Sequence, residues 1–411
     1  MNTRMDRSKL NIGTYILQPY ARSERNIREL AECGIDFVCC MGYDKPALDL
    51  FEKYHVGALV SGILPGWWGG DGANAGKMRD TNPMEAYEKA ADKFVDHPAI
   101  WAVDTGDEPS ALDFPYYGEV IDFVRRRFPK QFPYLNLYPN YASVSQNNAV
   151  ETVNQLGTPT YKEHIDVYCK CVGTDYICYD FYMYSANVPL AYENLRIVAD
   201  ACRNTGRSMW IVLQVNSSKP AEWISENRLR FQAYSAMAFG AESIIWACWT
   251  AGWWHNQVLD DKGEKTEQYD KLKAVNAELI RLGVPYMRYR NTATHFVGFA
   301  EDDPDLAKLG QKPVSALDTG VFADVKEENG KRLVVGQMVG RENIDSHALF
   351  VCAADDPKDE NPVDETITFR VIGKRDITVH TGNETYTLWK DEDGLYRVTV
   401  PACAGVLITA D

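Results

Sequence analysis

Three carboxylic acids follow a short apolar run near residue 100. Residues 99–103 have the pattern of a buried strand, and the turn after them contains Asp104, Asp107 and Glu108. Carboxyl groups this close together perturb one another, because a neighbouring negative charge disfavours ionisation. A carboxyl that stays protonated beside an ionised one can act as a general acid. Asp104, Asp107 and Glu108 are therefore candidates for acid–base chemistry.

The first 283 residues alternate between short apolar runs and segments with helical spacing, typical of parallel strands covered by helices. Eight strand–helix pairs predict a (β/α)8 barrel, the TIM-barrel architecture, whose active site lies at the C-terminal ends of the strands. The segment after residue 103 ends the fourth strand. The predicted strands are residues 11–17, 36–41, 57–64, 99–103, 133–138, 176–182, 209–215 and 243–249, and the predicted helices are residues 24–33, 47–54, 83–95, 116–128, 161–172, 190–204, 226–239 and 269–281.

Residues 284–411 have a different pattern, with few helical periods and many β-branched runs. The predicted strands here are residues 332–339, 348–353, 366–371, 377–380, 396–400 and 405–409. Turn clusters such as Glu328-Asn329-Gly330 and Asp393-Gly394 separate them and predict antiparallel hairpins. We expect two domains, a catalytic barrel over residues 1–283 and a small C-terminal antiparallel β-sandwich over residues 284–411.

Composition narrows the classes of partner. The net charge of −15 argues against nucleic acid or an anionic membrane surface. No apolar stretch approaches the ~20 residues that span a bilayer, and the N-terminus lacks the apolar segment of a secretory signal. The ten cysteines have no regular spacing and lie mostly in apolar runs, which predicts reduced thiols in a cytoplasmic protein.

The predicted strand ends carry aromatic, amide and carboxylate side chains and almost no cations. A phosphate ligand would call for Arg, Lys or a glycine-rich helix start. Aromatic faces and hydrogen-bonding side chains suit a neutral polyhydroxylated ligand such as a sugar. The alternative is that the tryptophans are core residues, which fits Trp101, Trp210 and Trp246 better than the glycine-flanked pairs Trp67-Trp68 and Trp253-Trp254. The predicted substrate-binding residues are Trp67, Trp68, Asp107, Asn136, Tyr138, Tyr182, Gln214, Trp249, Trp253 and Trp254.

The segment Asp107-Glu108-Pro109 resembles the Asn-Glu-Pro motif of the large clan of (β/α)8 retaining glycoside hydrolases. The segment from Gly263 to Gly283 and the β domain after it resemble the closing part of β-galactosidase-like members. The motif is three residues long, and its position on the fourth strand supplies most of its specificity. The resemblance implies that Glu108 is the general acid/base. Asp104 or Asp107 nearby would then keep it protonated through like-charge repulsion.

Two positions depart from that clan. Asp107 stands where the motif has Asn, and Gln214 stands at the end of strand seven, where the clan places its nucleophile glutamate. An amide cannot form the usual covalent intermediate, so either Gln214 was introduced in place of a glutamate to trap a complex, or the second carboxylate comes from elsewhere. Asp180 at the end of strand six is then the best candidate. Strands four and six are not neighbours, so we expect the ~6.5–9.5 Å carboxyl separation of inverting enzymes rather than the ~5–5.5 Å of retaining ones.

The sequence therefore predicts a cytoplasmic glycoside hydrolase that acts on a small soluble glycoside or oligosaccharide, with Glu108 and Asp180 as catalytic residues. The alternative is a carbohydrate-binding pseudoenzyme that lost its nucleophile at Gln214. No cofactor is expected. No metal is expected either, since His255 is the one histidine near a predicted strand end. The expected partner is a small carbohydrate, with no nucleic acid and no membrane, and the chain is a possible homo-oligomer.

Overall fold

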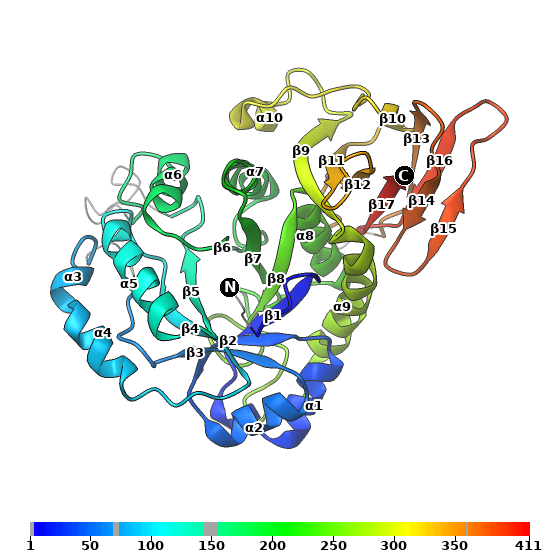
Figure 1. The fold of residues 1–411 in the computed structure, drawn as a ribbon. Helices are drawn as coiled ribbons and strands as arrows, with labels where there is room; N and C mark the ends of the chain where they lie inside the picture. Colours follow the sequence, from blue (N-terminus) through cyan, green and yellow to red (C-terminus); the bar gives the residue numbers. More distant parts are fainter. Residues whose placement is uncertain (1–3, 69–73, 143–154, 359–360) are drawn as a thin grey trace.

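The computed structural model describes residues 4–68, 74–142, 155–358 and 361–411. Eight parallel strands form a closed barrel in sequence order, with β8 paired to β1 (Figure 1). This confirms the predicted barrel. The barrel strands are β1 Asn11–Tyr15, β2 Phe37–Gly42, β3 Gly57–Ser61, β4 Ile100–Asp107, β5 Phe132–Leu137, β6 Tyr176–Phe181, β7 Ser208–Gln214 and β8 Ala241–Ala247.

Helices surround the barrel and follow the predicted alternation. Polar caps fix several of their starts: Ser23 and Asp44 accept backbone N–H groups of α1 and α2, and Thr160 with Glu163 forms a capping box on α6. The predicted helix over residues 83–95 is the shorter helix α4, and the short helix α3 that precedes it was not predicted. The helices are α1 Glu24–Glu32, α2 Lys45–Lys53, α3 Met78–Thr81, α4 Met84–Ala91, α5 Phe114–Arg127, α6 Tyr161–Cys171, α7 Val188–Thr205, α8 Glu226–Ala238, α9 Glu267–Tyr286 and α10 Pro304–Leu309, with a 3-10 turn at Pro19–Ala21.

Large side chains fill the lower barrel interior. Trp210 stacks on Tyr176 with ring centroids 4.3 Å apart, and Phe132 contacts the same indole edge-on. The guanidinium of Arg7 lies over all three rings and covers the barrel floor. The barrel is therefore a packed core rather than a pore, and open space is left at its C-terminal end.

Strand β4 is longer than predicted, because it continues from Ile100 to Asp107 instead of ending at Val103. Its pairing with β5 shifts register between Asp104 and Asp107, and Gly106 has a φ of 142° at this bulge. A side chain at Gly106 would collide with the hydroxyl of Tyr117 and the carbonyl of Trp67. The bulge re-aims Asp107 after Asp104, as β-bulges next to active sites do.

The C-terminal part forms two antiparallel sheets, as predicted. Their orders are β10-β13-β16 and β15-β14-β17-β12-β11-β9, and a separate apolar core lies between them. Along β12, Leu349 and Val351 face this core, while Phe350 faces the barrel helices. The strands are β9 Tyr289–Val297, β10 Phe322–Glu327, β11 Leu333–Gly340, β12 His347–Ala353, β13 Glu365–Val371, β14 Ile377–His380, β15 Thr385–Leu388, β16 Tyr396–Val400 and β17 Gly405–Ala410.

The two turn clusters do not form the predicted hairpins. Residues 328–330 connect β10 to β11, and residues 393–394 lie between β15 and β16, so each cluster links strands of different sheets. The carboxylate of Glu327 accepts the backbone N–H groups of Asn329 and Lys331, which stabilises a turn without strand pairing. Strands β9, β10 and β15 were not predicted. Helix α9 runs to Tyr286, so the proposed domain boundary after Gly283 falls inside its last turn.

The six-stranded sheet packs on α8 beside α9 (Figure 1). Gly336 of β11 lies against the carbonyl of Ala238 at the end of α8, where a Cβ would be 2.3 Å from the oxygen. Arg230 of α8 binds Glu278 of α9 at 2.8–3.0 Å, which ties together the two helices under the sheet. The ten cysteines are all in the described part of the chain, and none forms a disulfide there. In that part no helix combines the length and apolarity needed to cross a bilayer.

Candidate active site

The C-terminal ends of β1, β4, β5 and β6 and the loops after β3 and β8 surround a cavity of about 340 Å³. Its lining is aromatic and acidic: Tyr15, Trp68, Asp107, Glu108, Asn136, Asp180, Tyr182 and Trp253. Seven of these eight residues were predicted as site residues. None of these lining residues carries a positive charge, and no group of His, Cys, Asp and Glu among the described residues is arranged to hold a metal ion.

Asn136 connects the acidic residues of β4 and β6. It is paired with Asp107 across β4 and β5, and with Cys178 across β5 and β6. Its Nδ2 donates to Asp107 Oδ1 at 3.1 Å and to Asp180 Oδ1 at 2.9 Å, while its Oδ1 accepts from Cys178 Sγ at 3.4 Å. One buried amide therefore uses all of its groups and fixes both carboxylates.

Glu108 reaches across the end of β5 to Asp180. Its backbone has a φ of 45°, and its N–H donates to the carbonyl of Asn136 at 2.9 Å, so the chain turns over β5. The carboxyl of Glu108 forms a hydrogen bond with that of Asp180 and accepts the indole N–H of Trp68 at 3.2 Å. The expected wide separation of the two carboxyl groups is therefore wrong, because the turn over β5 brings them into contact.

Burial raises the pKa of Glu108 well above its usual value, and the charges of Asp180 and Asp107 raise it further. Burial and the charge of Asp107 raise the pKa of Asp180 to about 7, against the opposing hydrogen bond from Asn136. The shared proton therefore belongs to Glu108, and Asp180 is the first of the two to ionise. A carboxylic acid beside a carboxylate is the arrangement that acid-catalysed cleavage needs.

Two more carboxyl groups lie behind this pair. Burial raises the pKa of Asp107 to about 6, opposed by the hydrogen bond from Asn136. Burial also raises the pKa of Asp104 to about 7, helped by the charge of Asp107 and opposed by the N–H of Gly106 at 3.0 Å. The predicted influence of Asp107 on Glu108 is present. Asp104 is not among the groups that raise the pKa of Glu108; instead, the charge of Asp107 raises the pKa of Asp104.

Aromatic rings form the walls of the cavity. Trp253 contacts Tyr15 and Tyr182, each with ring centroids 5.9 Å apart, and its indole N–H is buried with no hydrogen-bond partner in the described structure. Trp68 is 61% exposed at the rim, so its face is free to cover a ligand. Trp254 lies against Tyr182 at 4.9 Å and outside the lining. These flat faces with few competing charges suit a sugar ring.

Three more of the predicted substrate-binding residues, all aromatic, lie away from the cavity. The indole of Trp67 is buried in the barrel core, and the residue contributes a carbonyl that accepts the N–H of Asp107 at 2.9 Å. Tyr138 packs beside His164 of α6, and Trp249 is fully buried against Tyr269 of α9. These rings are core residues, the alternative that had been kept open for the tryptophans.

Gln214 is also buried and does not line the cavity. Its Oε1 accepts the backbone N–H of Tyr184 at 3.0 Å, and its Nε2 donates to Ser185 Oγ at 3.3 Å. The amide therefore holds the loop after β6, a role that a carboxylate could fill only in part. The pseudoenzyme alternative depended on Gln214 as a lost nucleophile, and this position does not favour it.

Tyr15 is the lining residue that the sequence did not predict. It ends β1, and its hydroxyl shares a hydrogen bond of 2.6 Å with that of Tyr134. The sequence contained the information needed to predict Tyr15, since residues 11–17 were predicted as a strand and the strand ends were expected to form the site. Because β1 and β8 are neighbours in the closed barrel, Tyr15 lies beside the β8 loop that carries Trp253.

No protein-family model and no curated protein matches this sequence. Among solved structures, a cycloisomaltooligosaccharide glucanotransferase from Paenibacillus sp., complexed with cycloisomaltoheptaose, has a TM-score of 0.55 at 9% identity and covers 98% of this chain and 85% of its own. A family 51 α-L-arabinofuranosidase from Bifidobacterium longum gives 0.44 at 9% identity, covering 98% and 96%, and a β-galactosidase from the psychrophilic Marinomonas ef1 gives 0.45 at 10%, covering 66% and 59%. The neighbours of this fold thus include glycoside hydrolases, and the likeness is one of fold, with no specific family assigned.

Proposed function

We propose that this protein is a glycoside hydrolase in which Glu108 protonates the leaving oxygen and Asp180 is the partner carboxylate. The observation that carries the proposal is the hydrogen-bonded Glu108–Asp180 pair in an aromatic cavity at the strand C-terminal ends. Cleavage of a glycosidic bond requires one carboxylic acid and one carboxylate on opposite sides of the bond. The pair supplies both forms at once.

The substrate is a small soluble glycoside or an oligosaccharide end. A cavity of about 340 Å³ accommodates one sugar ring with part of a second, because drug-sized ligands occupy sites of ~300–1,000 Å³. Trp68 and Trp253 cover the apolar faces of the ring. Asp107, held in place by Asn136, accepts hydrogen bonds from its hydroxyl groups.

The reactive form holds one proton on the carboxyl pair, and this sets the pH profile. Asp180 loses its proton near pH 7, and Glu108 keeps its proton to a higher pH, so the singly protonated pair is populated above neutrality. We expect kcat/KM to rise as pH increases from 5 through 7 and to fall again when Glu108 ionises. A profile that is already maximal at pH 5 would contradict this assignment.

The test compares leaving groups. Each of a panel of 4-nitrophenyl and 2,4-dinitrophenyl glycosides is assayed with the wild type, Glu108→Gln, Asp180→Asn and the control Glu85→Gln, an exposed residue on α4. Loss of a general acid costs roughly 10²–10⁴-fold, and the loss is smaller for a leaving group that needs no proton. Glu108→Gln should therefore depress nitrophenyl cleavage more than dinitrophenyl cleavage, whereas Asp180→Asn should depress both.

Two results would remove the proposal. Equal activity of Glu108→Gln and the wild type would exclude Glu108 from the reaction. Binding of a sugar in the cavity without cleavage of any glycoside in the panel would make the protein a carbohydrate-binding module. Circular dichroism of each variant checks that the fold is retained.

A further inference from the structure

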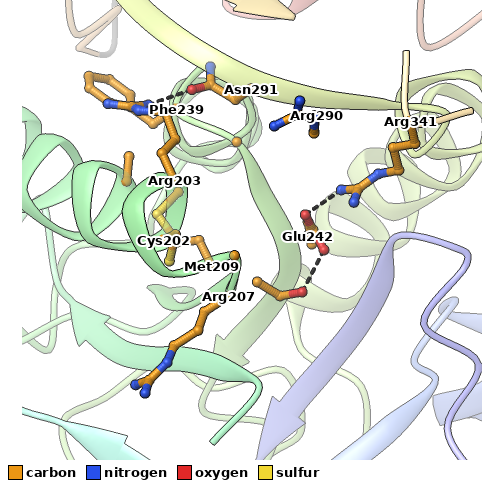
Figure 2. A pocket seen from close by; sticks show the side chains of 13 residues that line it. Cys202, Arg203, Arg207, Met209, Phe239, Glu242, Arg290, Asn291 and Arg341 are labelled. Atoms are coloured by element: carbon orange, nitrogen blue, oxygen red, sulfur yellow. Dashed lines mark hydrogen bonds and ion pairs between the residues drawn. The ribbon is translucent and has the colours of Figure 1, made fainter. Parts of the chain in front are cut away.

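A second cavity lies at the opposite end of the barrel from the candidate active site. It has a volume of about 120 Å³ and lies among the first residues of β7 and β8, the last turns of α7 and α8, and strand β9 (Figure 2). The seven-residue strand β7 separates the two sites by roughly 20 Å. Four arginines and one carboxylate line this basal cavity: Arg203, Arg207, Arg290, Arg341 and Glu242.

The carboxylate of Glu242 is fully engaged by its neighbours. One oxygen accepts from Arg341, and the other accepts from Ser208 Oγ at 2.6 Å (Figure 2). Arg341 also donates its Nε to the carbonyl of Tyr289 at 3.0 Å. Its Nη1 makes no hydrogen bond within the described residues and stays available to a ligand.

Two of the other arginines stabilise the fold through hydrogen bonds within the protein. Arg203, in the last turn of α7, donates to Asn291 and Asp200. Arg207 donates to the carbonyls of Cys169 and Val172, both at 2.9 Å, and its guanidinium points away from Glu242 (Figure 2). Their charges also offset the partial negative charge at the C-terminal ends of nearby helices.

Arg290 has no such role. It is exposed on β9 at the cavity, and within the described structure its guanidinium makes no hydrogen bond and no ion pair. The chain has 58 acidic against 43 basic residues, so carboxylates that could pair with an arginine are plentiful. An unpaired arginine beside two paired ones leaves uncompensated positive charge in a small concave space.

We propose that the basal cavity binds the phosphate group of a small organic phosphate. A cavity of about 120 Å³ equals the liquid volume of roughly four waters, enough for a tetrahedral oxyanion but too small for a sugar ring. Arg290 and the free Nη1 of Arg341 provide the planar, multidentate donors that phosphate prefers. The net charge of −15 does not prevent binding, because charges beyond about 8 Å are screened at physiological ionic strength.

The organic part of the ligand has a place beside the phosphate. Arg341 also lines a neighbouring cavity of about 700 Å³, together with Arg7, Arg288, Asn343 and Ser346. These polar side chains suit a hydroxylated group. The ligand would contact β8 of the barrel and β9 of the C-terminal sheets, so it would bind the folded protein and raise its melting temperature.

The test is a titration of the full chain with glucose 6-phosphate, inorganic phosphate, glucose and potassium chloride at matched ionic strength. Calorimetry gives the affinity, and differential scanning fluorimetry gives the change in Tm. We expect saturable binding of glucose 6-phosphate, weaker binding of inorganic phosphate, and no saturable effect of glucose or chloride. Arg290→Gln should weaken phosphate binding about tenfold or more, and Arg290→Lys should weaken it less.

The matched control is Arg281→Gln, the same change at an exposed arginine of α9 that does not line the cavity. Arg290 holds no other side chain in place, so its variants should fold normally. Equal effects of glucose 6-phosphate and chloride on Tm, or equal affinity in the wild type and Arg290→Gln, would overturn the proposal. Binding of inorganic phosphate without binding of glucose 6-phosphate would refute the proposal that the ligand is an organic phosphate.

Discussion

The substitution Asp104→Asn should make the stability of this protein less sensitive to pH. Asp104 has a pKa of about 7 in the folded protein, raised by burial and by the charge of Asp107, against 3.8 in the unfolded chain. Between these two values the folded state holds a proton that the unfolded state has lost. The free energy of unfolding therefore falls as pH rises from about 4 to 7 and is level above that.

The size of the effect follows from these values. Between pH 5 and pH 7 the Asp104 contribution falls by about 1.4 kcal/mol per pH unit, which gives about 3 kcal/mol as an upper value. The amide introduced by Asp104→Asn has the same shape and can still accept the N–H of Gly106, and it does not titrate. The free energy of unfolding of the variant should thus rise by about 2–3 kcal/mol relative to that of the wild type when the pH changes from 5 to 8. Any pH-independent change in stability caused by replacing the acid with an amide is the same at both pH values, so it cancels in this comparison.

Urea unfolding followed by tryptophan fluorescence measures this difference at pH 5, 6, 7 and 8. Nine of the ten tryptophans lie in the first 283 residues, so the signal reports on the barrel. The control is Asp261→Asn, the same change at an exposed residue after β8. An Asp104→Asn difference that is constant across this pH range would refute the reasoning, since Asp104 would then be ionised in the folded protein throughout the range, as it is in the unfolded chain.

Three further changes probe the site. Trp68→Phe removes the indole donor to Glu108, so the alkaline limb of the kcat/KM profile should move to higher pH with little change in Tm. Asn136→Ala removes the hydrogen bonds to two carboxylates, and urea unfolding should show a loss of about 2–4 kcal/mol at pH 8 and less at pH 5. Gln214→Glu places a carboxylate at a position 1% exposed, so thermal melting should show destabilisation that grows with pH, and assays of aryl glycosides should show no gain of hydrolysis.

The sequence predicted the barrel well, because a closed parallel sheet imposes the same pattern eight times. Because the active site of a barrel lies at the C-terminal ends of its strands, the sequence placed Glu108, Asn136 and Asp180 together, although Glu108 and Asp180 are 72 positions apart in the chain. The position of a residue at a strand end does not give the direction in which its side chain points. The contact between Glu108 and Asp180 depends on a left-handed residue and on the bulge at Gly106, neither of which has a sequence signal beyond one glycine.

The predictions from sequence were wrong mainly for residues that follow the end of a strand. Trp249 and Tyr138 lie within two residues of the ends of β8 and β5, but the alternation of side chains ends with the strand, and both rings turn into the helix layer. The turn clusters at Asn329 and Gly394 have hairpin composition, yet they connect two sheets. Local sequence identifies a turn, whereas strand partners depend on contacts that are distant along the chain.

The contact between the two carboxyl groups limits how the proposed reaction can begin. Glu108 and Asp180 are closer than the ~5–5.5 Å or ~6.5–9.5 Å that glycoside cleavage requires, so a bound glycoside must separate them. Asp180 is 5% exposed and held by Asn136, whereas Glu108 is held at the rim by the exposed Trp68. Glu108 is therefore the group that moves, and the glycosidic oxygen replaces Asp180 as its partner. Substrate entry would then convert a proton-sharing pair into a separate acid and anion, and the distance that Glu108 moves would decide between retention and inversion.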